Sequence, residues 1–165
     1  MTQYTEQSFK ETLYECHKHI EKITVAKLHL SKHMPLTVEK YTRLNDIDLS
    51  FVDQLIFRFS KLQDTLGEKL FPSVLTLSEE DVKRKTFLDI LNRLEELDII
   101  EKNEWLKLRE IRNEIAHEYS FNTEGLVESI TNIYNTSDNL IKFFHDVHEF
   151  YKENFTFLSS TKECT

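Results

Sequence analysis

Residues 123–151 read TEGLVESITNIYNTSDNLIKFFHDVHEFY, and this stretch carries the clearest periodic pattern in the chain. Apolar or small residues recur in it at alternating spacings of four and three positions: Leu126, Ile130, Ile133, Ser137, Leu140, Phe144, Val147 and Tyr151. An α-helix turns once in about 3.6 residues, so it places all of these positions on one face. The stretch therefore predicts a long helix, capped at Thr123, whose apolar seam packs against neighbouring helices.

Two further long helices are expected before this one in the first half of the chain. The first spans about residues 5–30 and ends before Met34-Pro35, because proline cannot continue the helical hydrogen-bond pattern. The second spans about residues 37–66 and ends at Gly67, which is a plausible helix breaker or C-cap.

The middle of the chain predicts a short helix or turn at residues 71–75 and two more long helices. Ser78 is expected to cap a helix over about residues 82–97, and Asn103 to cap the next. Short connections between long amphipathic helices predict an all-α fold, an antiparallel up-and-down bundle of four to five helices.

Composition agrees with a single helical domain. The chain has 165 residues but only two glycines and two prolines, so it lacks the residues that a multi-hairpin β fold needs for its turns. No repeat or flexible linker divides it. We therefore expect one helical domain at residues 1–155, followed by a polar C-terminal tail at residues 156–165.

Charge and cysteine content limit the function and the location. The net charge of −8 argues against a broad nucleic-acid-binding surface, although it leaves room for a small basic cleft at Arg109 and Arg112. Cys16 and Cys164 have no C-x-x-C spacing, which is typical of reduced thiols in a cytosolic protein. No apolar run approaches the ~20 residues of a membrane span. We expect a cytoplasmic protein with no membrane partner.

The helix that begins near Asn103 carries a line of polar residues beside its apolar face. Arg109, Asn113 and His117 follow at intervals of four, so they lie on one side of the helix. Arg112 and His117 are five apart, which separates them by roughly 140° around an ideal helix. They can converge if the helix ends or bends near Ala116, or they can act across a two-fold axis, where a second copy supplies the complementary set.

An arginine with a histidine matches the chemistry of RNA cleavage through the internal 2′-hydroxyl. Arginine binds phosphate and stabilises developing charge, while histidine titrates near neutral pH and can act as general base or acid. Such a reaction requires neither metal nor cofactor, and none is expected here, since no convincing metal-ligand spacing is present. Taken as bare spacing, however, an Arg-x4-His pair is common by chance and is better explained as a solvated surface pair.

The full segment at residues 106–119 changes that balance. It reads LKLREIRNEIAHEY and closely resembles the signature of HEPN-domain proteins, specifically the HepT-like group, whose pattern is R-N-x-x-x-H-x-Y. Each fixed position is filled here, by Arg112, Asn113, His117 and Tyr119. The similarity in layout spans roughly residues 5–152, but only the motif segment is specific.

The resemblance implies a helical-bundle homodimer whose two motifs line a shared cleft. It implies a metal-independent endoribonuclease toxin, with an RNA substrate, in which Arg112 binds the scissile phosphate and His117 is the general acid or base. Asn113 would orient the phosphate or the imidazole. It also implies a cognate MNT-type nucleotidyltransferase antitoxin that transfers AMP from ATP to Tyr119. The added anionic nucleotide would block an RNA phosphate by charge and by volume.

Two alternatives remain open at the level of the sequence. The acidic net charge favours a non-catalytic helical dimer that binds a nucleotidyltransferase and presents its substrate, whereas the intact Arg112, Asn113 and His117 favour the enzyme. A plain structural bundle would make the motif a coincidence. Arg109 is outside the signature and is a candidate RNA contact.

Overall fold

The computed structural model describes residues 2–117 and 121–155, and within these residues every regular element is a helix. The α-helices are α1 (Thr2–Leu30), α2 (Val38–Thr42), α3 (Asp46–Thr65), α4 (Phe71–Leu77), α5 (Phe87–Glu96), α6 (Lys102–His117) and α7 (Thr123–Phe155). A short 3₁₀ turn, Ser31–His33, follows α1, and a π-helical segment, Leu66–Leu70, joins α3 to α4. The predicted all-α class is confirmed; the predicted tail at 156–165 lies outside the described residues.

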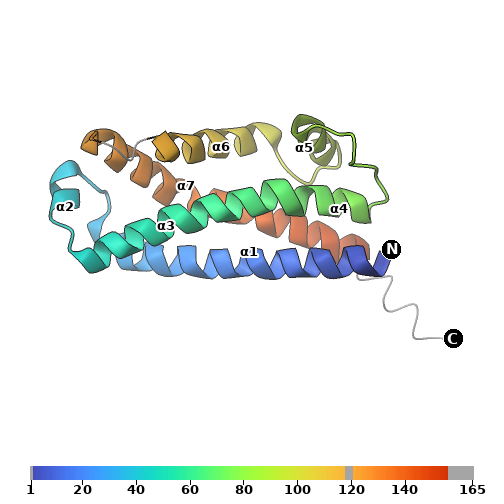
Figure 1. Ribbon diagram of the computed structural model, residues 1–165, viewed down its shortest axis with the longest axis horizontal. Helices are drawn as coiled ribbons and strands as arrows, with labels where there is room; N and C mark the ends of the chain where they lie inside the picture. Colours follow the sequence, from blue (N-terminus) through green and yellow to red (C-terminus); the bar gives the residue numbers. More distant parts are fainter. Residues whose placement is uncertain (1, 118–120, 156–165) are drawn as a thin grey trace.

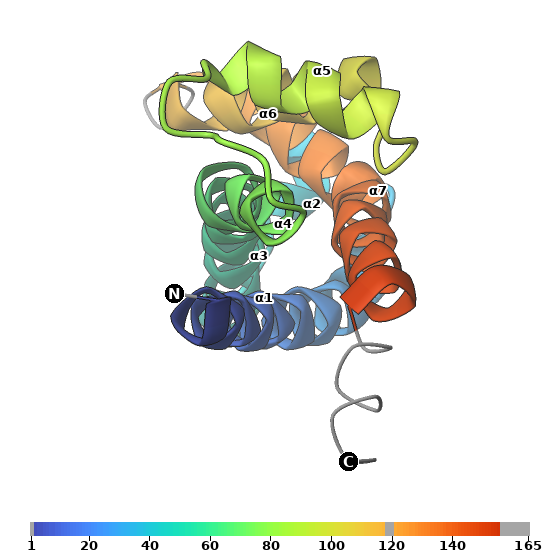
Figure 2. The ribbon, with the colours of Figure 1, turned by 90° about the vertical axis from the view of Figure 1, so that its right-hand side faces the viewer.

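The helices pack in layers around a shared core. α1 and α3 lie side by side and run in opposite directions, while α5 and α6 lie above α3 and α4 on the side away from α1 (Figure 1). The view along the molecule shows α7 flanking these layers, from α6 at one end to α1 at the other (Figure 2). As a result, α6 is held between α3 and α7.

The apolar seam of α7 forms much of the core, as its periodicity predicted. Seven of its positions are buried, namely Ile130, Ile133, Ser137, Leu140, Phe144, Val147 and Tyr151. Leu126 is partly buried against the same cluster. Burial of an apolar face supplies most of the stability of a helix in a folded protein. None of the described helices combines the length and the apolar character needed to cross a membrane.

The expected helix over residues 37–66 is instead two helices, so the count of four to five helices was too low. The break falls just before Asn45, whose side chain accepts a hydrogen bond from the backbone N–H of Asp48 and caps α3. Thr37 caps the short α2 in the same way, by accepting from the N–H of Lys40. Side-chain caps satisfy backbone donors that a helix start leaves free, so two caps make two helices.

The prediction that Gly67 ends a helix is wrong. Gly67 lies inside the π-helical segment that carries α3 directly into α4. A Cβ atom at this position would lie 3.2 Å from Cζ2 of Trp105 and 3.4 Å from Cε2 of Phe87. The lack of a side chain at Gly67 therefore allows the backbone to approach the rings of Trp105 and Phe87 closely.

The prediction that Ser78 starts a helix is also wrong, because the chain between Leu77 and Phe87 is non-helical. The Ser78 hydroxyl donates to the carbonyl of Val74, at the end of α4, and caps no new helix. Thr86 is the cap, and it forms a reciprocal capping box with Asp89 at the start of α5.

The last two helices each begin one to two residues earlier than their predicted caps imply. Asn103 lies within α6, which begins at Lys102. At α7, the side chain of Asn122 accepts from the N–H of Gly125, so Asn122 performs the capping that was predicted for Thr123.

Candidate functional site

Helix α6 divides its side chains between the core and a cavity. Trp105, Leu108 and Ile115 are buried in the core. Arg109 and Asn113 are exposed and Arg112 is half-buried, and all three line a cavity of about 360 Å³. The structure thus brings together three of the five residues singled out from the sequence.

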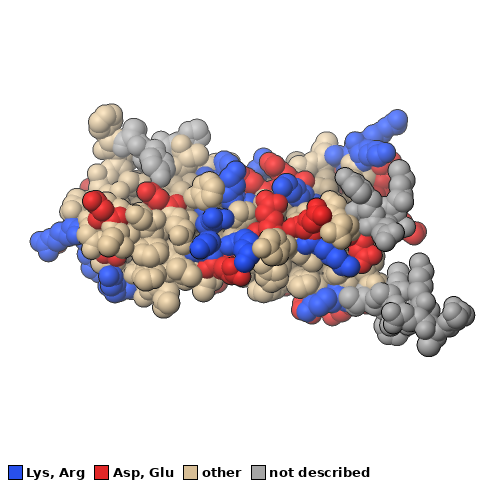
Figure 3. All heavy atoms as spheres, turned by 60° about the horizontal axis from the view of Figure 1, so that its bottom comes forward, with Lys and Arg blue, Asp and Glu red and all other residues tan. Residues whose placement is uncertain are grey.

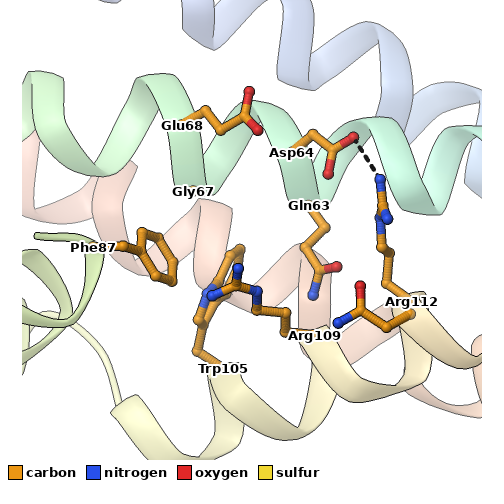
Figure 4. Close-up of a pocket in the computed structure, with 9 residues that line it drawn as sticks. Gln63, Asp64, Gly67, Glu68, Phe87, Trp105, Arg109 and Arg112 are labelled. Carbon is orange, nitrogen blue, oxygen red and sulfur yellow. Dashed lines mark hydrogen bonds and ion pairs between the residues drawn. The ribbon is translucent and has the colours of Figure 1, made fainter.

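The cavity lies between α6 and the end of α3 (Figure 4). Its walls come from α3 and the π-helical segment, from the first residue of α5, and from α6: Gln63, Asp64, Gly67, Glu68, Phe87, Trp105, Arg109, Arg112 and Asn113. Small-molecule sites in proteins typically have volumes of roughly 300–1,000 Å³, so this cavity is large enough for a small organic group.

Arg112 is tethered to the facing helix. Its Nη2 donates to Oδ2 of Asp64 at 3.3 Å, and both side chains are 34% exposed (Figure 4). Asp64 was not identified as a site residue from the sequence, because it lies on a different helix from the motif. The pairing leaves Arg112 beside the cavity with a carboxylate as its present counter-ion.

Arg109 stacks on an aromatic wall of the same cavity. Its guanidinium carbon lies 5.0 Å from the ring centroid of Phe87, a cation–π arrangement. The cavity lining therefore contains two guanidinium groups, from Arg109 and Arg112, and two carboxylates, from Asp64 and Glu68. The formal charges of this lining cancel.

Two buried hydrogen-bond donors in the lining have no partner. Nε2 of Gln63 and Nε1 of Trp105 are buried without any hydrogen bond, and the residues are only 4% and 1% exposed. In Figure 4 the Gln63 amide extends from α3 toward α6. A buried donor that makes no hydrogen bond costs about 1–3 kcal/mol of stability, so such donors are rare in folded proteins. One signal in the sequence could have revealed Gln63. It follows Phe59 by four residues, so it is a polar residue at a position on the buried face of α3 where an apolar residue is expected.

The remaining motif residues are not placed relative to Arg112. α6 stays helical as far as its last residue, His117, so it does not end before the histidine. The side chain of His117 and the whole of Tyr119 lie outside the described residues. Among the described residues, no three His, Cys, Asp or Glu side chains are grouped so as to hold a metal ion.

The surface charge outside the cavity is mixed. On the face shown in Figure 3, acidic and basic side chains lie among each other, and that face has no continuous basic track. Many charged side chains of the described residues form ion pairs within the chain, such as Lys18 with Glu21 at 3.2 Å and Lys69 with Glu15 at 2.9 Å. A nucleic acid would therefore have to be bound locally and not along this face.

No family model, no curated protein and no solved structure matches this chain. The resemblance to HepT-like proteins consequently rests on the motif segment at residues 106–119.

Proposed function

We propose that this protein is a cytoplasmic, metal-independent endoribonuclease of the HepT-like HEPN type, acting as the toxin of a toxin–antitoxin pair. The observation that carries the proposal is that Arg112 and Asn113, consecutive residues of the R-N-x-x-x-H-x-Y signature, both line one cavity at the side of α6. A cavity with a guanidinium at its edge can bind a phosphate of RNA next to the reacting groups.

In the proposed reaction, the ribose 2′-hydroxyl attacks the adjacent phosphorus atom. A base, assigned to His117, accepts the hydroxyl proton as the new O2′–P bond forms. The P–O5′ bond breaks, and the leaving oxygen takes up a proton from a general acid. The products are a 2′,3′-cyclic phosphate and a free 5′-hydroxyl, so no water, metal or redox partner is consumed. Arg112 stabilises the negative charge on the phosphorane, and Asn113 orients the phosphate.

We further propose that two up-and-down helical-bundle protomers form a homodimer around this site. Arg112 and His117 are five residues apart in the sequence, and positions five apart on an ideal helix are separated by about 140° around its axis. A two-fold axis beside α6 would let one copy supply the arginine and the other the histidine.

The proposed control of the toxin is modification of Tyr119 by a cognate MNT-type nucleotidyltransferase. The tyrosine oxygen attacks the α-phosphorus of ATP, a phosphotyrosyl ester of AMP forms and pyrophosphate leaves. The added anionic group would compete with an RNA phosphate for the guanidinium of Arg112.

Two observations favour a second function. Arg112 is already paired with Asp64, in a chain of net charge −8. Both features suit a non-catalytic helical dimer that binds the nucleotidyltransferase and presents its substrate.

Cleavage of RNA by the purified protein in EDTA decides between the two functions. The preparation is first checked by intact mass, so that Tyr119 is known to be unmodified. We expect the parent protein to leave cyclic-phosphate ends, and His117→Ala and Arg112→Ala each to lose about 10²–10⁴-fold in rate. Arg84→Ala, which removes an exposed arginine from the loop before α5, is the matched control and should retain activity. Absence of cleavage by the parent would reject the enzyme in favour of the non-catalytic dimer.

A further inference from the structure

The two unpartnered donors in the cavity require an explanation that the phosphate chemistry does not give. Gln63 and Trp105 take no part in the proposed cleavage, yet both residues line the cavity and their Nε2 and Nε1 atoms are buried without hydrogen-bond partners. Trp105 can only donate, and the buried atom of Gln63 is its amide nitrogen, which also donates. A ligand that satisfies both atoms must carry hydrogen-bond acceptors.

The walls of the cavity show the shape of that ligand. Phe87 and Trp105 supply aromatic surface, and the guanidinium of Arg109 lies close enough to Phe87 to stack, 5.0 Å from its centroid. Gly67 allows this arrangement, because a Cβ there would come within 3.2 Å of the Trp105 ring. Aromatic rings and guanidinium planes are the surfaces on which unpaired nucleobases stack.

The charge of the cavity lining favours a nucleobase over an isolated phosphate as the ligand. The two guanidiniums of the lining are balanced by the carboxylates of Asp64 and Glu68. With Arg112 paired to Asp64, the lining suits a neutral planar ring with polar edges, and a phosphate binds at Arg112 only by displacing Asp64. Carboxylates can also accept from the exocyclic amino group of a base.

We propose that this cavity is a nucleobase subsite, in which Gln63 and Trp105 donate to acceptors on the edge of the base and Arg109 stacks on the ring. The subsite rests on the proposed function in one respect: the base is that of the RNA nucleotide whose phosphate Arg112 binds. Gln63 and Trp105 are then specificity-determining residues, since a base whose edge lacks acceptors at their positions leaves the donors unsatisfied.

Trp105 gives a direct probe, because it is the single tryptophan of the chain. Its fluorescence is measured in the unmodified protein during titration with AMP, GMP, CMP and UMP, with ribose 5-phosphate, and with 2′-O-methyl oligonucleotides that lack the nucleophile. We expect at least one base-containing ligand to change the emission and ribose 5-phosphate to leave it unchanged. An equal response to ribose 5-phosphate, or no response to any nucleotide or oligonucleotide, would overturn the subsite. The mononucleotide and oligonucleotide arms distinguish a free nucleotide from a base held in RNA.

Gln63→Leu tests whether the amide serves a ligand or the fold. The substitution removes an unsatisfied buried donor, so we expect a higher melting temperature together with at least a tenfold weaker binding of the responding ligand. Gln54→Leu is the matched control on the same helix, because the Gln54 amide already donates to the carbonyl of Lys22 at 2.8 Å. It should lose stability and keep the binding. A lower melting temperature for Gln63→Leu, or unchanged binding, would contradict the proposal.

A second variant keeps the test independent of Gln63. Trp105→Phe removes the Nε1 donor but keeps an aromatic ring, and its binding is followed by anisotropy of a labelled 2′-O-methyl oligonucleotide. We expect a loss of the parent's base preference; a preference identical to the parent's would overturn the role of Trp105.

His117→Ala separates the two proposals, since it should retain base binding while losing cleavage. Base binding without cleavage by the parent would reject the ribonuclease alone, and cleavage whose base preference survives Gln63→Leu would reject the subsite alone.

Discussion

Arg112 of α6 and Asp64 of α3 form an ion pair between the two helices, with Nη2 of the arginine 3.3 Å from Oδ2 of the aspartate. Both side chains are 34% exposed, so solvent screens the pair, and such pairs contribute about 0–1 kcal/mol to stability. A phosphate offers the same guanidinium a bidentate partner. Asp64 is therefore a weakly held counter-ion that an RNA phosphate must displace.

We expect Asp64→Asn to tighten RNA binding by several-fold and to lower the free energy of unfolding by less than about 1 kcal/mol. The neutral amide no longer competes for Arg112. Binding is measured by anisotropy with a 2′-O-methyl oligonucleotide at low and at physiological salt. Glu68→Gln is the control, because it removes one negative charge from the same cavity without releasing Arg112. Equal tightening by both variants would show a general charge effect, and weaker binding of Asp64→Asn would mean that Asp64 positions the arginine.

The fold was predictable where the signal is local. The seam of α7 repeats within one helix, and its buried positions follow from spacing alone. Gly67 was misjudged because its reason is tertiary: the rings that it approaches, Phe87 and Trp105, lie far along the chain. No rule based on neighbouring residues could distinguish this glycine from a helix end.

The start of α5 shows a different limit. Ser78 with Asp81, and Thr86 with Asp89, both have the form of a capping box, so the local rule permits either start. The structure uses the second, after which Ile90, Leu91 and Leu94 are buried on one face. Burial of an apolar stripe thus decided between two equivalent caps.

The candidate site was predictable only on one of its two helices. Arg109, Arg112 and Asn113 were selected from their pattern along α6, and all three line the cavity. Gln63 and Asp64 come from α3, and Asp64 is 48 residues away from its partner Arg112. Pairing between helices depends on how they pack, which a single sequence does not specify.

We expect Leu140→Ala to destabilise the protein by about 2–5 kcal/mol, because Leu140 is fully buried in the seam of α7 and its truncation leaves a cavity. Chemical denaturation followed by circular dichroism measures the change. Leu28→Ala is the matched control: Leu28 is 72% exposed on α1, and its truncation should change stability by no more than about 0.5 kcal/mol. Similar losses in the two variants would contradict the packing of α7 into the core.

Stability should fall as the pH drops below about 6.5, and His19 should account for part of the fall. Burial, followed by the nearby Arg58 guanidinium, lowers the pKa of His19 in the folded protein. The unfolded state then binds more protons in this range, so the contribution of His19 is present above the unfolded pKa and is lost as the pH falls through the folded pKa. Each unit of lowering corresponds to about 1.4 kcal/mol.

The variant that tests this is His19→Gln, whose amide oxygen can still accept from Arg58 but does not titrate. Its free energy of unfolding should fall less than that of the parent between pH 7.5 and pH 5.5. Some slope should remain, because burial also lowers the pKa of His148. His148→Gln should reduce that remainder, and a slope equal to the parent's in His19→Gln would contradict the assignment.

We expect the thiol of Cys16 to be nearly inert in the folded protein. Its side chain is fully buried, and burial, reinforced by the negative charge of Glu15, raises the pKa of the thiol to about 12. The thiolate is the reactive species, so at pH 8 the reaction should be slower by about three orders of magnitude than that of an ordinary cysteine. In a Cys164→Ser background, where Cys16 is the sole thiol, a disulfide reagent should react slowly with the native protein and rapidly in guanidinium. Cys16→Ser, which leaves only Cys164, controls for the reagent. A native rate for Cys16 equal to its unfolded rate would mean that α1 opens away from α3 readily in solution.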